Sequence, residues 1–174
     1  MKRLLLLIIA TVGIFTCYAQ KSKSFYYEGI EFHNTKGWSI QPSKDGNTTF
    51  IFGIKGSDQF HIYKQKITEQ TQSIDTYLNK IVEQTTENNF NTTGKQIAKI
   101  KEVGDIMEGY INALPVKYVD IAYTKKINQR IYAMYANNCL YTIICTVSGN
   151  VDDKLGKILS TLTFTPESNT NRLL

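Results

Sequence analysis

The sequence predicts an α+β fold in which an antiparallel β-sheet is covered by two amphipathic helices. Two observations predict it: five strand-like segments follow one another in the second half of the chain, and each of two helical segments carries one apolar stripe. The connections between these strands are too short for parallel crossovers, which need a dozen or more residues. Each helix has one stripe to bury, and the sheet offers the surface. The five segments are residues 97–103, 105–112, 116–124, 129–135 and 140–147.

The chain before the first helix also favours strands. Residues 25–32 indicate an extended entry in which Gly29 allows a bend, and residues 42–47 are typical of a turn. Two runs rich in β-branched and aromatic residues, 49–54 and 59–67, are separated by four turn-forming residues. They predict a β-hairpin.

Both helices have recognisable starts. Ser73 is suited to cap a helix over residues 74–84, and Asp75 lies in its first turn, where the helix dipole favours an anion. Asn150 is placed to cap the second helix, with Asp152 and Asp153 in its first turn. The apolar stripes consist of Ile74, Tyr77, Leu78, Ile81 and Val82 in the first helix and Val151, Leu155, Ile158, Leu159 and Leu162 in the second.

Residues 1–19 have the layout of a secretory signal peptide. Lys2 and Arg3 precede an apolar run over residues 4–15, and Ala19 is the small residue after which cleavage is expected. The run is shorter than the roughly 20 apolar residues of a transmembrane helix. The sequence therefore predicts an exported protein, periplasmic or secreted. The alternative is a lipoprotein cut before Cys17 and tethered to a membrane, although bulky side chains precede that cysteine.

The mature chain is expected to form one domain, residues 20–166, with a flexible polar tail at 167–174. Hydrophobic residues make up 42% and charged residues 20%, which excludes a disordered chain. The net charge of +5 falls to +3 without the leader, with 18 basic against 15 acidic residues. This balance is too mild to indicate a nucleic-acid partner.

The candidate chemical groups are few. Cys139 and Cys145 are six apart in one predicted strand, about 20 Å, so we expect two buried thiols, and a disulfide only if the chain folds back between them. With no CxxC or HxxxH pattern, neither a metal nor a cofactor is expected. His61 alternates with Phe60 and Ile62 and is predicted to face solvent. Asp120 is either a perturbed acid on a half-buried face or a carboxylate paired with Lys117 or Arg130. We therefore assign no catalytic residue.

Tyrosines in the strand-rich half suggest a binding surface, because tyrosine combines contact area with a polar tip. Tyrosine is equally a normal sheet residue, so a purely structural role stays open. Lysines and Arg130 add a basic bias to this half that would favour an acidic partner or an anionic surface. The candidate binding surface comprises Tyr118, Tyr123, Arg130, Tyr132 and Tyr135.

Three motifs carry a resemblance to a known family. They are Phe-Tyr-Tyr-Glu-Gly-Ile at residues 25–30, Gly-Trp-Ser-Ile at 37–40, and a final helix that runs into Thr-Phe at 163–164. With the intervening hairpin and helix, the chain resembles the PsbP-like superfamily, which includes the photosystem accessory protein PsbP and the envelope lipoprotein DcrB. The resemblance implies an α-β-α sandwich and a non-enzymatic role in binding or stabilising a partner. It offers no catalytic residue to transfer.

Three functional hypotheses follow. The first is a non-enzymatic exported protein that binds an envelope or secreted protein, either as an accessory subunit or as a periplasmic immunity protein against a toxin. The second is a carrier of a small apolar or anionic ligand held between the sheet and the helices. The third is an enzyme with a carboxylate-based site around Asp120.

Overall fold

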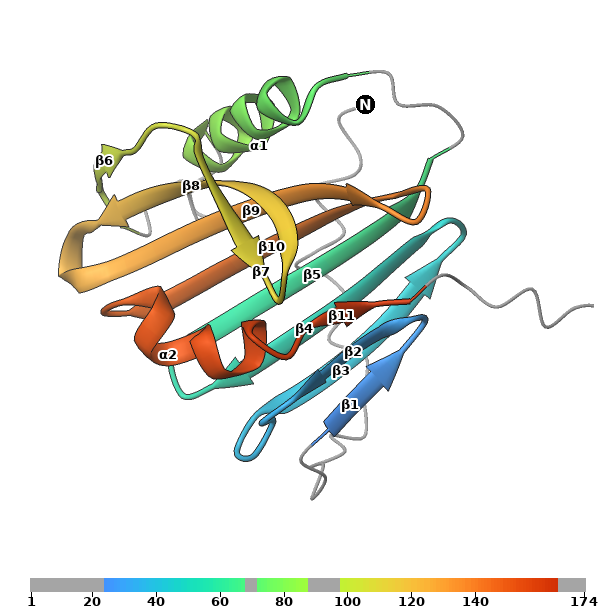
Figure 1. Ribbon diagram of the computed structural model, residues 1–174. Coiled ribbons are helices and arrows are strands. Elements are labelled where there is room, and N and C mark those ends of the chain that lie inside the picture. The colour runs from blue at the N-terminus through green and yellow to red at the C-terminus, as the bar shows by residue number, and fades with distance from the viewer. Residues whose placement is uncertain (1–23, 68–71, 88–97, 166–174) are drawn as a thin grey trace, which may run out of the picture.

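The computed structural model describes residues 24–67, 72–87 and 98–165, which form two antiparallel sheets and two helices (Figure 1). The large sheet has eight strands in the order β3-β4-β5-β10-β9-β8-β6, with β7 also paired to β8. Its strands are β3 (Ser39–Asp45), β4 (Thr48–Lys55), β5 (Asp58–Lys66), β6 (Ile100–Val103), β7 (Met107–Ile111), β8 (Leu114–Tyr123), β9 (Ile127–Ala136) and β10 (Cys139–Ser148). The small sheet has the order β1-β2-β11, from β1 (Ser24–Tyr27), β2 (Ile30–His33) and β11 (Thr163–Phe164).

The two faces of the large sheet have separate cores. Helix α1 (Ile74–Glu87) packs on β8 and β9, where Leu78 is fully buried against Val119 and Ile131. Helix α2 (Val151–Leu159) and the small sheet cover the opposite face, and Leu155 and Phe32 are fully buried there. The described part of the chain therefore forms three layers, with the large sheet in the middle (Figure 1).

The predicted helix starts are confirmed. The backbone N–H of Thr76 donates to Ser73 Oγ at 3.1 Å, which satisfies one of the N–H groups left free at the start of α1. Asn150 Oδ1 accepts from the N–H groups of Asp152 and Asp153 at 2.7 and 3.3 Å. The predicted apolar stripe of α2 is also confirmed, since all five of its residues are buried.

Tight turns connect the central strands. Asn112 and Ala113 join β7 to β8 with positive φ angles of 44° and 68°, and Asn137 and Asn138 join β9 to β10 with φ angles of 51° and 55°. Two consecutive left-handed residues form the turn that matches the twist of a hairpin. At Gly29, between β1 and β2, φ is +78° and a Cβ would lie 2.6 Å from the Thr165 carbonyl oxygen, so only glycine fits.

The structure confirms most of the predicted elements and corrects two expectations. Pro42 lies inside strand β3 and not in a turn; β3 is the outer strand of the large sheet, where the missing N–H of proline is tolerated. Residues 25–32 and 163–164 form a second sheet, which the sequence analysis did not separate from the first. Cys139 and Cys145 are free and buried, as predicted. The predicted leader, Cys17 and the tail 167–174 lie outside the described residues.

No helix in the described ranges has the length and the apolar character needed to cross a membrane.

Substituting Gly53 tests the packing between the large sheet and the small one. A Cβ at position 53 would lie 2.2 Å from Phe60, whose ring is almost fully buried and cannot move aside. We expect Gly53→Ala to lower the free energy of unfolding by about 1–3 kcal/mol, the usual cost of overpacking. Gly156→Ala is the control, because no atom lies within 4 Å of the added methyl and alanine favours the helix by about 0.5–1 kcal/mol. Urea denaturation measures the free energy of unfolding of both variants, which should fall for Gly53→Ala and rise for Gly156→Ala. A fall in both would contradict the assignment of the loss to the contact with Phe60.

Candidate functional site

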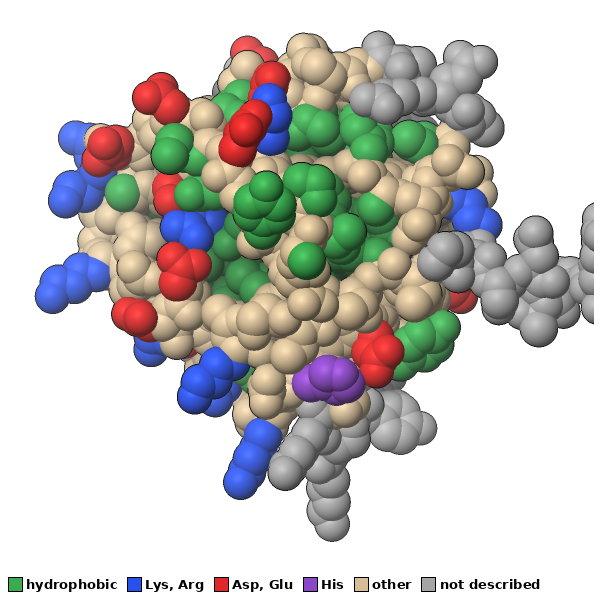
Figure 2. Space-filling model, in the orientation of Figure 1, with side chains coloured by type: hydrophobic (Ala, Val, Ile, Leu, Met, Phe, Trp, Pro, Cys, Tyr) green, Lys and Arg blue, Asp and Glu red, His purple; other side chains and the backbone are tan. Residues whose placement is uncertain are grey.

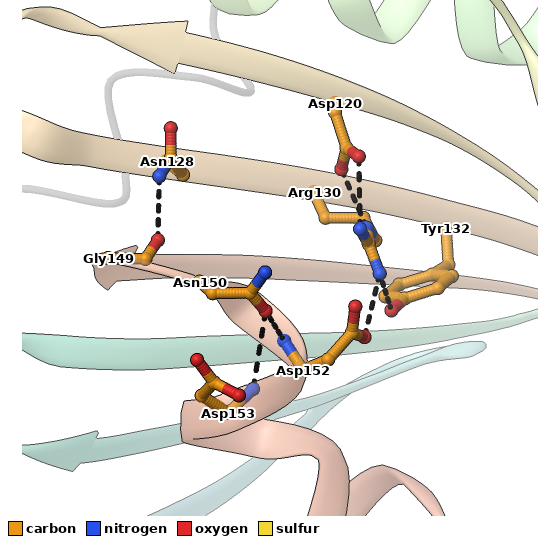
Figure 3. Close-up of polar contacts among 8 residues, drawn as sticks. All are labelled: Asp120, Asn128, Arg130, Tyr132, Gly149, Asn150, Asp152 and Asp153. Atoms are coloured by element: carbon orange, nitrogen blue, oxygen red, sulfur yellow. Dashed lines mark hydrogen bonds and ion pairs between the residues drawn. The ribbon is translucent and has the colours of Figure 1, made fainter.

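A cluster of polar side chains surrounds Arg130 where β8, β9 and the start of α2 meet (Figure 3). Asp120 on β8 and Arg130 on β9 are directly opposite each other in the strand register, so their side chains point to the same side of the sheet. Asp152 reaches the same point from the first turn of α2.

The guanidinium of Arg130 is held by two carboxylates. Nε and Nη2 donate to the two oxygens of Asp120 at 2.6 and 3.0 Å, and Nη1 donates to Asp152 at 2.8 Å. Nη1 also donates to the hydroxyl of Tyr132 at 3.3 Å. The paired geometry with Asp120 is the strong, bidentate form of an arginine–carboxylate contact. Four of the five N–H groups of Arg130 are thereby used.

Two aromatic rings flank the same guanidinium. The Cζ atom of Arg130 lies 4.7 Å from the ring centre of Tyr118 and 5.8 Å from that of Tyr132. Both distances fall within the range of a cation–π contact. The side chain of Arg130 is only 16% exposed, whereas those of Asp120 and Asp152 are 51% and 63% exposed. The arginine is therefore enclosed, and its two carboxylate partners lie toward solvent.

The surroundings shift several pKa values. Burial alone would lower the pKa of Arg130, but the hydrogen bonds with Asp120 and Tyr132 raise it above its ordinary value. Burial raises the pKa of Tyr132, and Arg130 offsets only part of that shift. Burial also raises the pKa of the Cys145 thiol to about 12, so that thiol is neutral and unreactive at physiological pH.

A cavity of about 310 Å³ opens beside the cluster. The side-chain amide of Asn128 donates to the Gly149 carbonyl at 2.6 Å and so fixes the loop that leads into α2 at the cavity wall (Figure 3). Glu102 supplies a further carboxylate, and it makes no ion pair within the described part of the chain. The lining residues are Glu102, Gly104, Asp120, Ile121, Ala122, Asn128, Arg130, Gly149, Asn150 and Val151.

The composition of the cavity decides which charge it favours. Arg130 already donates to two carboxylates, so little of its hydrogen-bonding capacity remains for an anion. Glu102 and Asp120 line the cavity beside it, and Asp152 pairs with it from α2. The cavity therefore favours a cationic group.

The structure brings together three of the five predicted site residues. Tyr118, Arg130 and Tyr132 form the cluster on the α2 side. Tyr123 is buried in the core under α1, and the hydroxyl of Tyr135 donates to the Gln72 carbonyl just before α1. The five residues do not form one surface. Glu102 and Asn128 at the cavity carry no sequence signal that predicts a site, and the position of Asp152 predicts only a helix-start residue.

Asp120 pairs with Arg130, one of the two partners that the sequence allowed. The other, Lys117, instead pairs with Asp75 on α1 at 2.9 Å and with Glu108 at 3.5 Å. The structure thus favours the ion-pair interpretation of Asp120 over that of a perturbed acid.

The two histidines have different surroundings. His33 Nδ1 lies 2.8 Å from Ser24 Oγ, and His33 Nε2 lies 3.8 Å from Glu31. Ser24 and His33 are directly opposite on the exposed β1–β2 hairpin, so the contact is an ordinary cross-strand pair. His61 points away from Phe60 as predicted, but not into solvent. Phe50 and Phe52 lie against its ring at centroid distances of 5.8 and 4.9 Å, and burial lowers its pKa to about 4.

Within residues 24–67, 72–87 and 98–165, no group of three or more His, Cys, Asp or Glu side chains could hold a metal ion.

Comparison with solved structures shows the fold. The solution structure of cyanobacterial PsbP (CyanoP) from Synechocystis matches 88% of this chain and 99% of its own, with a TM-score of 0.54 and 9% sequence identity. A crystal structure of a protein from Bacteroides thetaiotaomicron matches 85% of this chain and 50% of its own, with a TM-score of 0.40 and 14% identity. The match to cyanobacterial PsbP shows that the chain has a PsbP-like fold, as its motifs predicted. No protein-family model and no curated protein sequence matches it.

The Asp120–Arg130 pair is expected to matter for stability. Asp120→Asn removes one of the two charges that balance an arginine only 16% exposed, and we expect it to lower the free energy of unfolding by about 1–3 kcal/mol. Asp153→Asn is the control, because it makes the same chemical change in the first turn of α2; it should cost about 0.3–1 kcal/mol. Urea denaturation at neutral pH measures both. Equal losses of unfolding free energy in the two variants would show that the Asp120–Arg130 pair adds no more stability than an ordinary carboxylate at a helix start.

Protonation of His61 should destabilise the fold below neutral pH. Its pKa is about 4 in the folded chain and 6.5 ordinarily, so the unfolded chain binds more protons between these values. The contribution of neutral His61 to the free energy of unfolding is fully present above pH 6.5. It decreases as the pH falls toward 4 and then levels off. Between pH 8 and pH 5 we expect the wild type to lose about 2 kcal/mol more than His61→Phe. Urea titrations of both proteins at the two pH values measure the difference, and parallel losses would refute the assignment.

Proposed function

We propose that this protein is a non-enzymatic binding protein of the cell envelope that docks onto another protein through one edge of its large sheet. The observation that carries the proposal is a group of exposed apolar side chains on β6 and β7. Val103 is 43% exposed, Met107 53% and Tyr110 77%, all within two short neighbouring strands. Exposed aromatic and methionine side chains are enriched where proteins bind each other.

The surroundings of these residues support the proposal. Hydrophobic side chains gather in the middle of the face shown in Figure 2, over the β7–β8 hairpin, with acidic and basic side chains around them. Glu108 on β7 and Lys117 on β8 form a charged pair across that hairpin at 3.5 Å. An apolar centre with a polar rim is the usual composition of a protein–protein interface. The docking surface thus shifts from the predicted tyrosines to the β6–β7 edge.

The fold and the leader support the location and the class of function. A PsbP-like fold is consistent with an accessory role, which the sequence resemblance implied. The signal-peptide pattern supports export with cleavage near Ala19, and lipidation at Cys17 is the alternative. An accessory subunit and an immunity protein both fit this proposal.

A small ligand is the second candidate function, and the cavity beside Arg130 favours it. Its volume of about 310 Å³ lies at the lower end of the range for small-molecule sites. Native mass spectrometry of the purified protein would detect a retained ligand. Because Arg130 already donates to two carboxylates, the anionic ligand considered from the sequence is the less favoured kind.

Site-specific photo-cross-linking tests the docking surface. A benzophenone amino acid placed at Tyr110 should give a discrete cross-linked protein in the cell envelope, which mass spectrometry then identifies. Tyr26 is the matched control, because it is also a tyrosine, 66% exposed, but lies on β1 of the small sheet. We expect no discrete product from position 26. Failure to cross-link at position 110, or the same products from both positions, would overturn the proposal.

A further inference from the structure

We propose that the partner inserts a basic side chain, lysine or arginine, into the cavity beside Arg130 and packs a neighbouring apolar side chain on Met107. This inference rests on the proposed function and names the chemistry of the partner.

Of the exposed apolar residues on this edge, the register places Met107 on the same face as the cavity, whereas Val103 and Tyr110 point to the α1 side. Glu102 is opposite Ala122, and Met107 is opposite Tyr118. Residues directly opposite in an antiparallel pair point to the same side, and alternate residues along β8 share a face. Glu102, Met107 and Asp120 therefore all lie on the α2 side of the sheet. A segment that packs on Met107 can reach the cavity without crossing the strand.

The charges of the cavity select a basic side chain. Glu102 and Asp120 line the cavity beside Arg130, and Asp152 pairs with Arg130 from α2, which leaves an excess of negative charge. Ala122 and Val151 contribute apolar wall, which suits the methylene stem of a lysine or an arginine. An acidic side chain would face two carboxylates and an arginine that is already paired. Charge complementarity of this kind sets which partner binds and in which orientation.

The edge itself favours docking by side chains over addition of a strand. The register of β6 shifts between Ile100 and Glu102, and residues 104–106 separate β6 from β7. The N–H of Gly104 donates inward to the Asp120 carbonyl on β8 at 2.8 Å. An edge interrupted between two short strands is a poor template for an added strand. The side chains of the partner must therefore supply the contacts.

Peptide titrations followed by NMR test the inference on the ¹⁵N-labelled mature chain. The probes are the capped pentapeptides Ala-Leu-Arg-Leu-Ala and Ala-Leu-Glu-Leu-Ala. We expect the arginine peptide to give saturable amide shifts at Gly104, Asn128 and Gly149, weaker at high salt, and the glutamate peptide to give none. Equal shifts with both peptides would overturn the inference. If arginine amide alone binds as tightly as the arginine peptide, the inference is also overturned, because the occupant of the cavity would then be a small cation.

Variants supply the second test. Glu102→Lys should weaken binding of the arginine peptide at least about tenfold, because it puts a like charge at the cavity mouth. Met107→Ser should weaken it by a smaller factor. Glu83→Lys is the control: it makes the same charge change on the exposed side of α1, on the other face of the sheet, and should leave binding unchanged. Unchanged binding by Glu102→Lys would overturn the inference.

The same variants separate this inference from the proposed function. If position 110 cross-links a partner and Glu102→Lys leaves that product unchanged, the docking surface stands and the basic side chain is refuted. If position 110 yields no cross-linked protein, the proposed function is refuted. The inference that a protein partner inserts a basic side chain is then refuted as well. Loss of the cross-link in Glu102→Lys but not in Glu83→Lys would support both.

Discussion

The constraint on which the rest of this structure depends is that the large sheet must be buried on both faces. Strand β10 lies in the middle of that sheet, and Tyr141 and Cys145 are fully buried on the α2 side. A nine-residue helix such as α2 is only about 14 Å long, whereas seven or eight strands at about 4.8 Å each span more than 30 Å. Helix α2 cannot cover that face alone. The small sheet β1-β2-β11 covers the remainder, which explains why the chain needs a second sheet.

The Arg130 cluster is where this layered packing meets the solvent. Arg130 extends from β9 along the rim of the core, and Asp120 and Asp152 join it to β8 and to the start of α2. An enclosed ion pair often adds little net stability, since desolvation offsets the attraction, but losing one partner is costly. Its value here is positional, because Asp152 joins the start of α2 to β9, next to the Gly149 loop that Asn128 holds at the wall of the cavity.

The sequence predicted the helices and most strands because caps, stripes and alternation are local signals. It did not separate the two sheets, because the pairing of Thr163 with Glu31 depends on contacts between distant parts of the chain. The tyrosine surface was predicted from composition alone. The alternation of side chains along a strand argues against one surface for all five residues. Tyr118 and Tyr123 are five residues apart in one strand and therefore point to opposite faces. The burial of His61 could not be predicted, because it depends on which residues of β4 lie beside it.

The sign of the charge at the cavity shows why composition is a poor guide to a binding site. The chain carries a net charge of +5, and its strand-rich half is rich in lysine, which by itself would favour an acidic partner. At the cavity, however, Arg130 is neutralised by its own neighbours, and the unpaired carboxylate of Glu102 adds negative charge among the described residues. An acidic cavity on an otherwise basic surface disfavours most orientations of a basic partner and favours one. The same charges that weaken non-specific contact can therefore specify the docking geometry.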